Sequence, residues 1–309
     1  MRINVVNLKK HFGKTRAVDD ISFSFAAGQV VGFVGPNGAG KTTTMRILAT
    51  LDEPTEGDAF IDGISVVQEP EKARHLVGYV PDALPGHRDM TVRDYLDFFA
   101  RAYGVKGSRR RQVIEGIEEF TNLSGIREKT LHALSKGMKQ RVSLARSLLH
   151  DPPILIMDEP AAGLDPRARV ELRELLRVLA GQGKAILISS HILTELAEIC
   201  SGAVIIEQGK LLMAGSIDQL LTTNVAHRTV LVRPLERQEE LYRELLQTPN
   251  VQAARLVGPD IAIDVNGSDE MCADILTALV GRGFRLIEFK QDRANLEDIF
   301  MNITRGEVQ

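Results

Sequence analysis

Cysteine is scarce in this 309-residue sequence, and long hydrophobic runs are absent. Cys200 and Cys272 are the only two cysteines, too few and too far apart in the sequence to indicate a disulfide framework or a metal site. The longest apolar stretches, such as residues 154–157 and 203–206, fall far short of the roughly 18 to 20 apolar residues that cross a bilayer. We therefore expect a chain of the reducing cytoplasm, in which any role at a membrane requires a separate partner.

An excess of basic charge is also missing. The formal net charge is −3, whereas domains that hold nucleic acid by bulk electrostatics usually carry a basic patch. The densest basic run, residues 109–111, is interpreted as a solvated helix start. Residues 1–7 alternate like an edge strand and lack the apolar core of a secretion signal. The length leaves room for two domains, or for one large domain with an appendage.

A glycine-rich pattern dominates what is present. Residues 35–42 read Gly-Pro-Asn-Gly-Ala-Gly-Lys-Thr and fill the pattern G-x-x-x-x-G-K-[ST] directly after an apolar strand predicted at 30–34. Gly35, Gly38 and Gly40 are expected to turn backbone N–H groups toward phosphate oxygens, because glycine tolerates the required dihedrals and has no Cβ to block an anion. A chance match in a strand-to-helix turn is the alternative.

A helix predicted over about residues 41–49 would point its positive end at the same place. Lys41 is suited to reach the β/γ-phosphates, and the Thr42 hydroxyl is suited to ligate Mg²⁺. The pattern therefore predicts a cradle for the phosphates of a nucleotide.

Two adjacent carboxylates follow a second apolar strand. Residues 154–157 are Ile-Leu-Ile-Met, and Asp158 and Glu159 come directly after them. We expect Asp158 to hold Mg²⁺ and Glu159 to polarise the attacking water as a general base. The alternative is a helix-capping start before Pro160.

A second candidate anion site begins at Ser135, shortly before this strand. Ser135 is a natural N-cap, and residues 136 to about 149 are predicted to be helical. The arrangement offers a helix N-terminus that has no obvious phosphate in its own subunit. Taken alone, Ser135 and Gly137 also fit an ordinary cap and a tolerated glycine.

The order of predicted elements favours an α/β fold with an inserted helical lobe. Strands are predicted at 3–7, 21–25, 30–34, 154–157, 185–189 and 203–207, the later ones alternating with helices. This alternation indicates a largely parallel sheet covered on both faces. Residues 91–150 read as consecutive helices, in which Val92, Leu96, Phe99 and Tyr103 have the spacing of a packed core.

The pattern changes at about residue 222. The predicted order is strand 229–232, helix 236–246, strand 251–257, turn 258–260, strand 260–265, helix 269–282, strand 285–290 and helix 296–302. This β-α-β-β-α-β order suggests a small ferredoxin-like domain. We therefore expect a first domain at 1–222, with a helical subdomain at about 84–150, and a second domain at 223–309. Three roles are open for the second domain: capping the surface of the first, homodimer contact, or regulation.

In the order of its motifs the chain resembles the ATP-binding subunits of ABC transporters over about residues 1–220. Residues 35–42 match the Walker A motif, 134–140 the LSGGQ signature, 154–159 the Walker B motif and 163–165 the D-loop. His191 matches the switch histidine, and Phe12 occupies the place of the aromatic that stacks on adenine. The resemblance implies a P-loop NTPase cassette with an antiparallel β subdomain and an inserted α-helical subdomain, followed by the small α+β domain.

The resemblance also implies the site residues, with ATP and Mg²⁺ as cofactors. The implied ATP-binding residues are Phe12, Gly35, Pro36, Asn37, Gly38, Ala39, Gly40, Lys41, Thr42, Thr43, Ser135, Lys136, Gly137 and Asp165. The implied catalytic residues are Glu159, His191 and Lys41, and the implied metal ligands are Thr42, Asp158 and Asp82.

Two departures from the family pattern bear on mechanism. Lys136 stands where the signature usually has its first glycine, and Met138 stands where it has a residue of small or polar character, whereas Ser135 and Gly137 are kept. Asp82 stands where the Q-loop usually has glutamine; a carboxylate can approach Mg²⁺ through water but cannot donate an amide hydrogen bond. Together with the C-terminal domain, these departures resemble the branch that serves exporters with separate permease chains.

The resemblance implies an ATPase that drives export through separately encoded transmembrane permease subunits, at the cytoplasmic face of the cell membrane. Two subunits would face head to tail, each ATP lying between the cradle of one and the Ser135/Gly137 helix of the other. No nucleic acid partner is expected. One alternative is a soluble ABC-type ATPase acting on ribosomes or DNA, and another is an adaptor that binds ATP without hydrolysing it. The transported substrate does not follow from the sequence.

Overall fold

The computed structural model describes residues 1–84, 89–190, 199–217, 219–220, 228–266 and 268–292. These residues form two compact units, the first ending at Leu220 and the second built on the described residues beyond it. The expected boundary after residue 222 falls in 221–227, outside the described residues. In the described parts of the chain, no helix has the length and apolar character that crossing a membrane requires.

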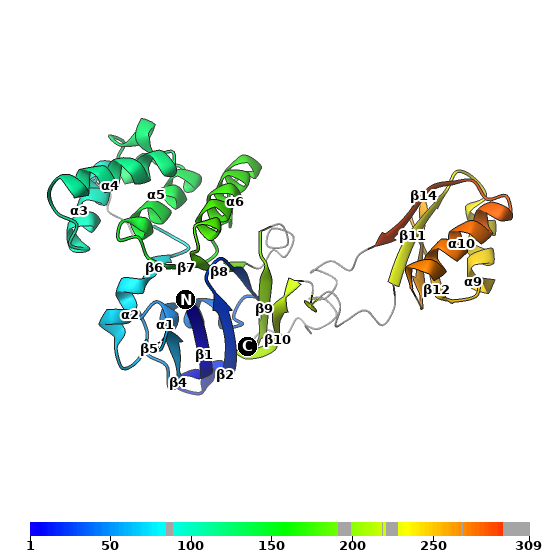
Figure 1. Ribbon diagram of the computed structural model, residues 1–309, viewed down its shortest axis with the longest axis horizontal. Helices are drawn as coiled ribbons and strands as arrows, with labels where there is room; N and C mark the ends of the chain where they lie inside the picture. Colours follow the sequence, from blue (N-terminus) through cyan, green and yellow to red (C-terminus); the bar gives the residue numbers. More distant parts are fainter. Residues whose placement is uncertain (85–88, 191–198, 218, 221–227, 267, 293–309) are drawn as a thin grey trace. The chain divides into compact units, whose positions relative to one another are not determined.

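A six-stranded sheet organises the first unit (Figure 1). Its strand order is β10-β9-β3-β8-β7-β6, with β3 at Val30–Val34, β6 at Val77–Val80, β7 at Ile154–Met157, β8 at Ala185–Ser190, β9 at Gly202–Glu207 and β10 at Lys210–Ser216. Only β10 runs antiparallel to its neighbour; the other pairs are parallel. Every residue of β3, β7 and β8 is buried, as in a sheet covered on both faces. The prediction of a largely parallel, covered sheet is confirmed.

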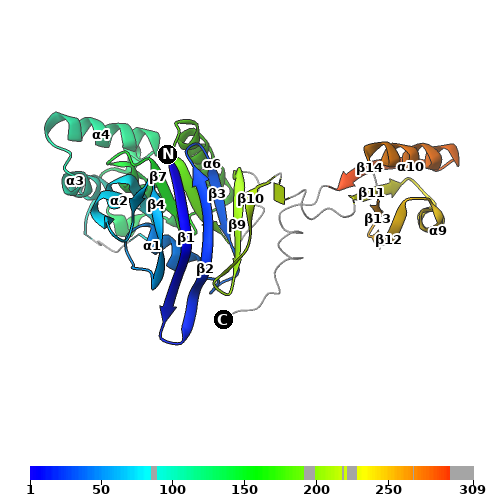
Figure 2. The same cartoon turned by 60° about the horizontal axis from the view of Figure 1, so that its bottom comes forward.

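An antiparallel sheet of four strands packs beside it, in the order β2-β1-β4-β5. Figure 2 shows the long hairpin of β1 (Arg2–Phe12) and β2 (Thr15–Ala26), with β4 (Glu56–Ile61) along the other side of β1. The short β5 covers Ile64–Ser65, and helix α2 (Pro70–Leu76) follows it.

The prediction of an edge strand at residues 1–7 is wrong, because β1 lies between two partners. Alternation of apolar and polar residues indicates only that one face of a strand is buried. An interior strand has the same pattern when its sheet is covered on one face. The buried side chains Ile3, Val5 and Leu8 join the core that also holds Phe33 of β3.

The helical lobe is inserted between β6 and β7. It contains α3 (Val92–Ala102), α4 (Gly107–Phe120) and α5 (Lys136–Leu148), with short 3₁₀ turns at Ser124–Ile126 and Leu131–Ala133. Val92 and Leu96 are fully buried in its core, against which Phe99 and Tyr103 pack. The predicted helical spacing of these residues is therefore confirmed. Helix α1 (Lys41–Leu48) follows β3, and α6 (Pro166–Gly181) joins β7 to β8.

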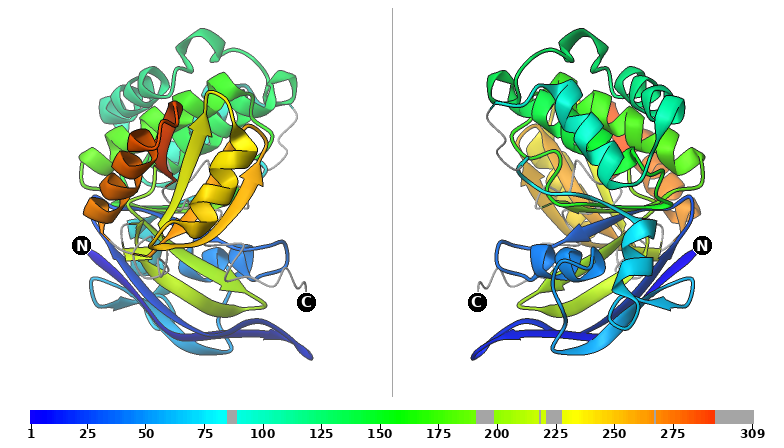
Figure 3. Two further views of the ribbon diagram at one scale, coloured as in Figure 1. Left: turned by 90° about the vertical axis from the view of Figure 1, so that its right-hand side faces the viewer. Right: turned by 90° about the vertical axis from the view of Figure 1, so that its left-hand side faces the viewer.

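The second unit has the predicted β-α-β-β-α-β order. It consists of β11 (Arg228–Pro234), α9 (Gln238–Gln247), β12 (Val251–Val257), β13 (Asp260–Val265), α10 (Asp269–Gly281) and β14 (Leu286–Asp292). The strand order β12-β13-β11-β14, antiparallel throughout, is that of a ferredoxin-like domain. Leu245 of α9 and Leu279 of α10 belong to the same buried cluster as Ile263 of β13, so the two helices cover one face of the sheet (Figure 3). The helix predicted at 296–302 lies outside the described residues.

Candidate nucleotide-binding site

A hollow of about 640 Å³ lies at the carboxyl ends of β3 and β7. In open α/β sheets, ligands bind at this edge. The hollow is lined by Phe12, Thr15, Ala17, Asn37, Gly38, Gly40, Lys41, Thr42, Thr43, Asp82, Lys136, Glu159 and Ala162. Thr15, Ala17 and Ala162 are the lining residues that sequence reasoning missed. Thr15 pairs with Phe12 across the β1–β2 hairpin, beyond the ends of the strands predicted at 3–7 and 21–25.

The positions of the cradle require glycine for different structural reasons. Gly38 and Gly40 have φ angles of 81° and 100°, in the left-handed region that favours glycine. At Gly40, a Cβ would also stand 2.3 Å from the Ala17 carbonyl oxygen. Gly35 differs from the prediction: its φ is not positive, and a Cβ there would stand 2.3 Å from the carbonyl oxygen of Ile206 on β9. Gly35 therefore lets the cradle pack closely on the sheet.

Lys41 lies at the floor of the hollow, with only 6% of its surface exposed. Its ammonium donates to the carbonyl oxygens of Gly35 (2.8 Å) and Pro36 (3.2 Å), and Glu159 Oε1 lies 3.6 Å away. Burial lowers the pKa of Lys41, although Glu159 and Asp158 act in the opposite direction. A phosphate oxygen placed here would supply further negative charge to a cation that is costly to bury.

Ser189 links the two carboxylates at the end of β7. Its hydroxyl donates to Asp158 Oδ1 (2.7 Å) and accepts from the Glu159 backbone N–H (2.8 Å). Glu159 has a φ of 47°, which is uncommon for a residue other than glycine. Sequence reasoning missed Ser189. Its signal is a polar residue at the end of the apolar strand β8, which pairs with β7.

The donor set fits Mg²⁺. Thr42 lines the hollow, whereas Asp158 does not; Asp158 is buried next to the lining residue Glu159, with one carboxylate oxygen engaged by Ser189. Among the described residues, no three His, Cys, Asp or Glu side chains gather into a complete metal site. Mg²⁺ suits such a sparse set, because it usually keeps several waters and binds one or two protein ligands plus substrate phosphates. Asp82 is exposed in the same hollow.

Phe12 is 55% exposed at the end of β1, with Lys10 Nζ 5.1 Å from its ring centre. Its ring is therefore accessible for stacking on a planar base. Pro36 and Ala39 belong to the cradle, where the Ala39 N–H donates to the Pro36 carbonyl (3.1 Å). His191 lies outside the described residues.

Ser135, Gly137 and Asp165 do not line the hollow of their own chain. Ser135 is the N-cap of α5, and its hydroxyl accepts from the Met138 N–H (3.3 Å). Gly137 faces Ala168 of α6, and Asp165 caps α6 by accepting from the Ala168 N–H (2.9 Å). The structure thus keeps two of the predicted signature contacts away from the cradle of the same chain, while Lys136 reaches it.

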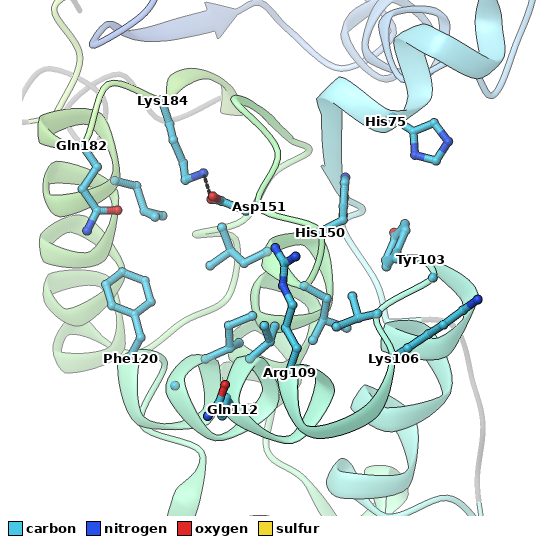
Figure 4. Close-up of a pocket in the computed structure, with 18 residues that line it drawn as sticks. His75, Tyr103, Lys106, Arg109, Gln112, Phe120, His150, Asp151, Gln182 and Lys184 are labelled. Atoms are coloured by element: carbon cyan, nitrogen blue, oxygen red, sulfur yellow. Dashed lines mark hydrogen bonds and ion pairs between the residues drawn. The ribbon is translucent and has the colours of Figure 1, made fainter.

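A second and larger hollow, of about 860 Å³, lies between α4 and the C-terminal ends of α5 and α6 (Figure 4). Lys106 and Arg109 line it from the start of α4, and Lys184 lines it opposite, paired with Asp151 (2.6 Å). Apolar side chains such as Ile117 form part of its wall. The hollow therefore combines basic and apolar surface.

The glycine cradle, its buried lysine and the carboxylates at the neighbouring strand end define a P-loop nucleotide-binding protein. The family model described as ABC transporter matches residues 18–162. Nod factor export ATP-binding protein I of Ralstonia nicotianae is 33% identical, covering 99% of this chain and 95% of the relative. The Bradyrhizobium diazoefficiens protein of the same name is 32% identical, covering 100% and 98%. The chain belongs to the ABC transporter family, as one of its ATP-binding subunits.

Solved structures agree with this assignment. An ATP-binding subunit of an ABC transporter superimposes with a TM-score of 0.67 and 29% identity, covering 80% of this chain and 100% of that one. A nucleotide-free ATP-binding cassette superimposes with a TM-score of 0.63 at 24% identity, covering 70% and 92%, and supports the fold alone.

Proposed function

We propose that this protein is the ATP-hydrolysing subunit of an exporter, working as a homodimer with separately encoded permease subunits at the cytoplasmic face of the membrane. The observation that carries hydrolysis is the placement of Glu159 beside Lys41 and Thr42 in one hollow. Relatives named for export match nearly the whole chain, including the C-terminal domain. Their names favour export over a soluble ATPase acting on ribosomes or DNA.

Each residue has a role in this proposal. Lys41 and the cradle N–H groups bind the β- and γ-phosphates of ATP, and Phe12 stacks on the base. Glu159 accepts a proton from the attacking water as general base. His191 contacts the γ-phosphate. Thr42 and Asp158, with Asp82 through water, hold Mg²⁺, which supplies neutralising charge to the phosphate oxygens.

The proposed dimer is supported by the position of Ser135 and Gly137, which lie away from the phosphate cradle of their own chain. Both belong to the N-terminus of α5, where backbone N–H groups favour an anion, but neither lines the cradle of its own chain. In a head-to-tail pair, these groups and Asp165 meet the ATP of the facing subunit. Donors supplied from both subunits stabilise the charge of the transition state only when the pair is closed.

The permease contact is proposed on the helical lobe and the Asp82 connection. Residues 91–150 carry twelve Lys and Arg against six Asp and Glu, a net charge of +6 in a chain whose total is −3. The larger hollow places some of this charge beside apolar walls (Figure 4). An acidic, amphipathic cytoplasmic segment of the permease is complementary to that surface.

The variant Glu159→Gln tests hydrolysis. Turnover should fall by at least about a hundredfold, within the range for loss of general base catalysis, while ATP binding and ATP-induced dimers persist. Lys41→Ala is the corresponding variant that tests binding, and it should lose most of its affinity for ATP. Substantial steady-state hydrolysis by Glu159→Gln, measured as phosphate release, would remove the proposed role of Glu159.

A further inference from the structure

The two departures from the family pattern carry opposite charges and meet in one hollow. Asp82 replaces a neutral glutamine and Lys136 replaces a neutral glycine, and both line the nucleotide hollow with Lys41 and Glu159. We propose that Asp82 and Lys136 form a compensating charge pair across the nucleotide hollow of a single chain, which sets its affinity for ATP. The inference rests on the proposed function and adds a role that the signature motif does not imply.

The chain positions of the two residues suit such a pair. Asp82 follows β6, where the chain leaves the six-stranded sheet for the helical lobe, and Lys136 is the first residue of α5, the last helix before β7. Two segments that are far apart in the sequence therefore place one charge each at the same hollow. In the part of the chain that the structure describes, neither side chain is within 4.0 Å of an oppositely charged group.

The Lys136 side chain points into its own chain rather than away from it. Its ammonium lies 2.9 Å from the position that a Cβ at Gly163 would occupy, and its Cδ lies 3.4 Å from that position. Gly163 belongs to the connection between Glu159 and α6, and its neighbour Ala162 lines the nucleotide hollow. This contact makes Lys136 a residue of its own subunit's hollow, in addition to any contact with a facing subunit.

The charge pair explains why the two departures occur together. Asp82 alone would add a negative charge to a hollow that receives the polyanion ATP, and the resulting repulsion would weaken binding. Lys136 restores the charge balance of the neutral glutamine and glycine. Because both side chains are exposed, the coupling acts through screened electrostatics and should weaken as salt increases.

A double-mutant cycle in the full-length protein tests the pair, with Asp82→Gln, Lys136→Met and the double variant. The readout is the Kd of a fluorescent ATP analogue, measured with EDTA and again with Mg²⁺, at low and at high salt. At low salt, Lys136→Met should weaken binding of the analogue about fivefold, and Asp82→Gln should strengthen it about threefold. The Kd of the double variant should differ by at least about threefold from the value that the product of the two single effects predicts. Lys136→Arg should restore affinity.

The control is Lys129→Met, which removes an exposed lysine of the same lobe that does not line the hollow. Single effects that simply multiply in the double variant, or coupling seen only with Mg²⁺ and unchanged by salt, would overturn the pair. If Lys136→Met fails to fold, the proposal is tested by comparing Asp82→Gln with the wild type at low and at high salt. The pair requires that the effect of Asp82→Gln on the Kd become smaller at high salt. Failure of the wild type to bind ATP at all would instead refute the proposed function.

Discussion

At the scale of single residues, Ser189 joins the two carboxylates, Asp158 and Glu159, on which the proposed hydrolysis depends. One hydroxyl donates to Asp158 and accepts from the Glu159 N–H, so it orients both the proposed metal ligand and the proposed general base. Positioning of this kind contributes to rate rather than to binding when the substrate contacts are unchanged.

We expect Ser189→Ala to lower the kcat of ATP hydrolysis by about tenfold, a typical cost of losing a residue that orients a metal ligand, with the Kd for ATP changed by no more than about twofold. Steady-state phosphate release and nucleotide titration measure the two quantities. Ser201→Ala, at the residue before β9, is the control. Unchanged kcat in Ser189→Ala would show that the carboxylates hold their positions without the hydroxyl.

His150 makes a second prediction at this scale. Its ring stacks on Tyr103 at a centroid distance of 4.2 Å, and its Nε2 lies 3.3 Å from the Val77 carbonyl oxygen. Burial lowers the pKa of His150 below 6.5, with smaller contributions in the same direction from His75 and Lys184. The unfolded chain therefore binds this proton more readily, and folding stability is lost as the pH falls below about 6.5.

His150→Phe keeps an aromatic ring and removes the titrating group. Between pH 7.5 and 5.5 the variant should lose less free energy of unfolding than the wild type, by at most about 1.4 kcal/mol per pH unit. Urea unfolding at the two pH values measures the difference. His132→Gln, an exposed histidine of the same lobe, serves as the comparison. Equal losses in His150→Phe and wild type would contradict the prediction.

How far the sequence predicts the site depends on how local each contact is. The cradle, Lys41, Asp158 and Glu159 follow from short motifs, because their roles depend on backbone geometry within a few residues. Ser189 and the reason for Gly35 were missed because both depend on contacts with other strands, of β8 with β7 and of the cradle with Ile206. Strand pairing partners are not encoded in a local pattern.

At the scale of elements, sequence periodicity was most successful where one face of an element is buried. The predicted strands 251–257 and 260–265 coincide with β12 and β13, because the turn at 258–260 fixes both ends. The sequence reading omitted β4, β5 and α2, which are short or only partly buried. The place of β4 is set by pairing with β1, and that of β5 by pairing with β4, rather than by their own patterns.

Helix α4 carries the prediction for the permease contact. Arg109 lines the larger hollow, whereas Arg111, on the same helix and exposed, does not. Arg109→Glu should reduce recovery of a multispanning membrane protein with the detergent-solubilised complex by about fivefold, because reversing a charge weakens a complementary interface. Arg111→Glu, with the same change in net charge, should have little effect. Equal recovery with both variants would place the contact elsewhere.

At the scale of the whole molecule, the chain has separate cores for its two units. Val230, Ile263 and Leu279 belong to one cluster, and the strands of the six-stranded sheet contribute to others. Cores that share no buried residues can unfold independently. The described residues therefore indicate two unfolding units, of which only one holds the nucleotide hollow.

Calorimetry should resolve two unfolding transitions. An ATP analogue at about 100 times its Kd should stabilise the cassette transition by about 2.7 kcal/mol and leave the transition of the ferredoxin-like domain in place. Leu245→Ala assigns the second transition, because removing a buried leucine lowers stability by about 2–5 kcal/mol. A single transition that shifts as a whole with nucleotide would show that the two cores unfold together.

Helix α5 belongs to two packing layers at once. Val142 and Ala145 join the core of the helical lobe, while Leu144 faces Leu172 of α6. The helix ends at Leu148, only a few residues before β7, which Asp158 directly follows. A rigid-body shift of the lobe therefore has a short covalent route to the carboxylate proposed to hold the metal, so a force applied at the surface of the lobe is transmitted to the reaction centre through the backbone itself.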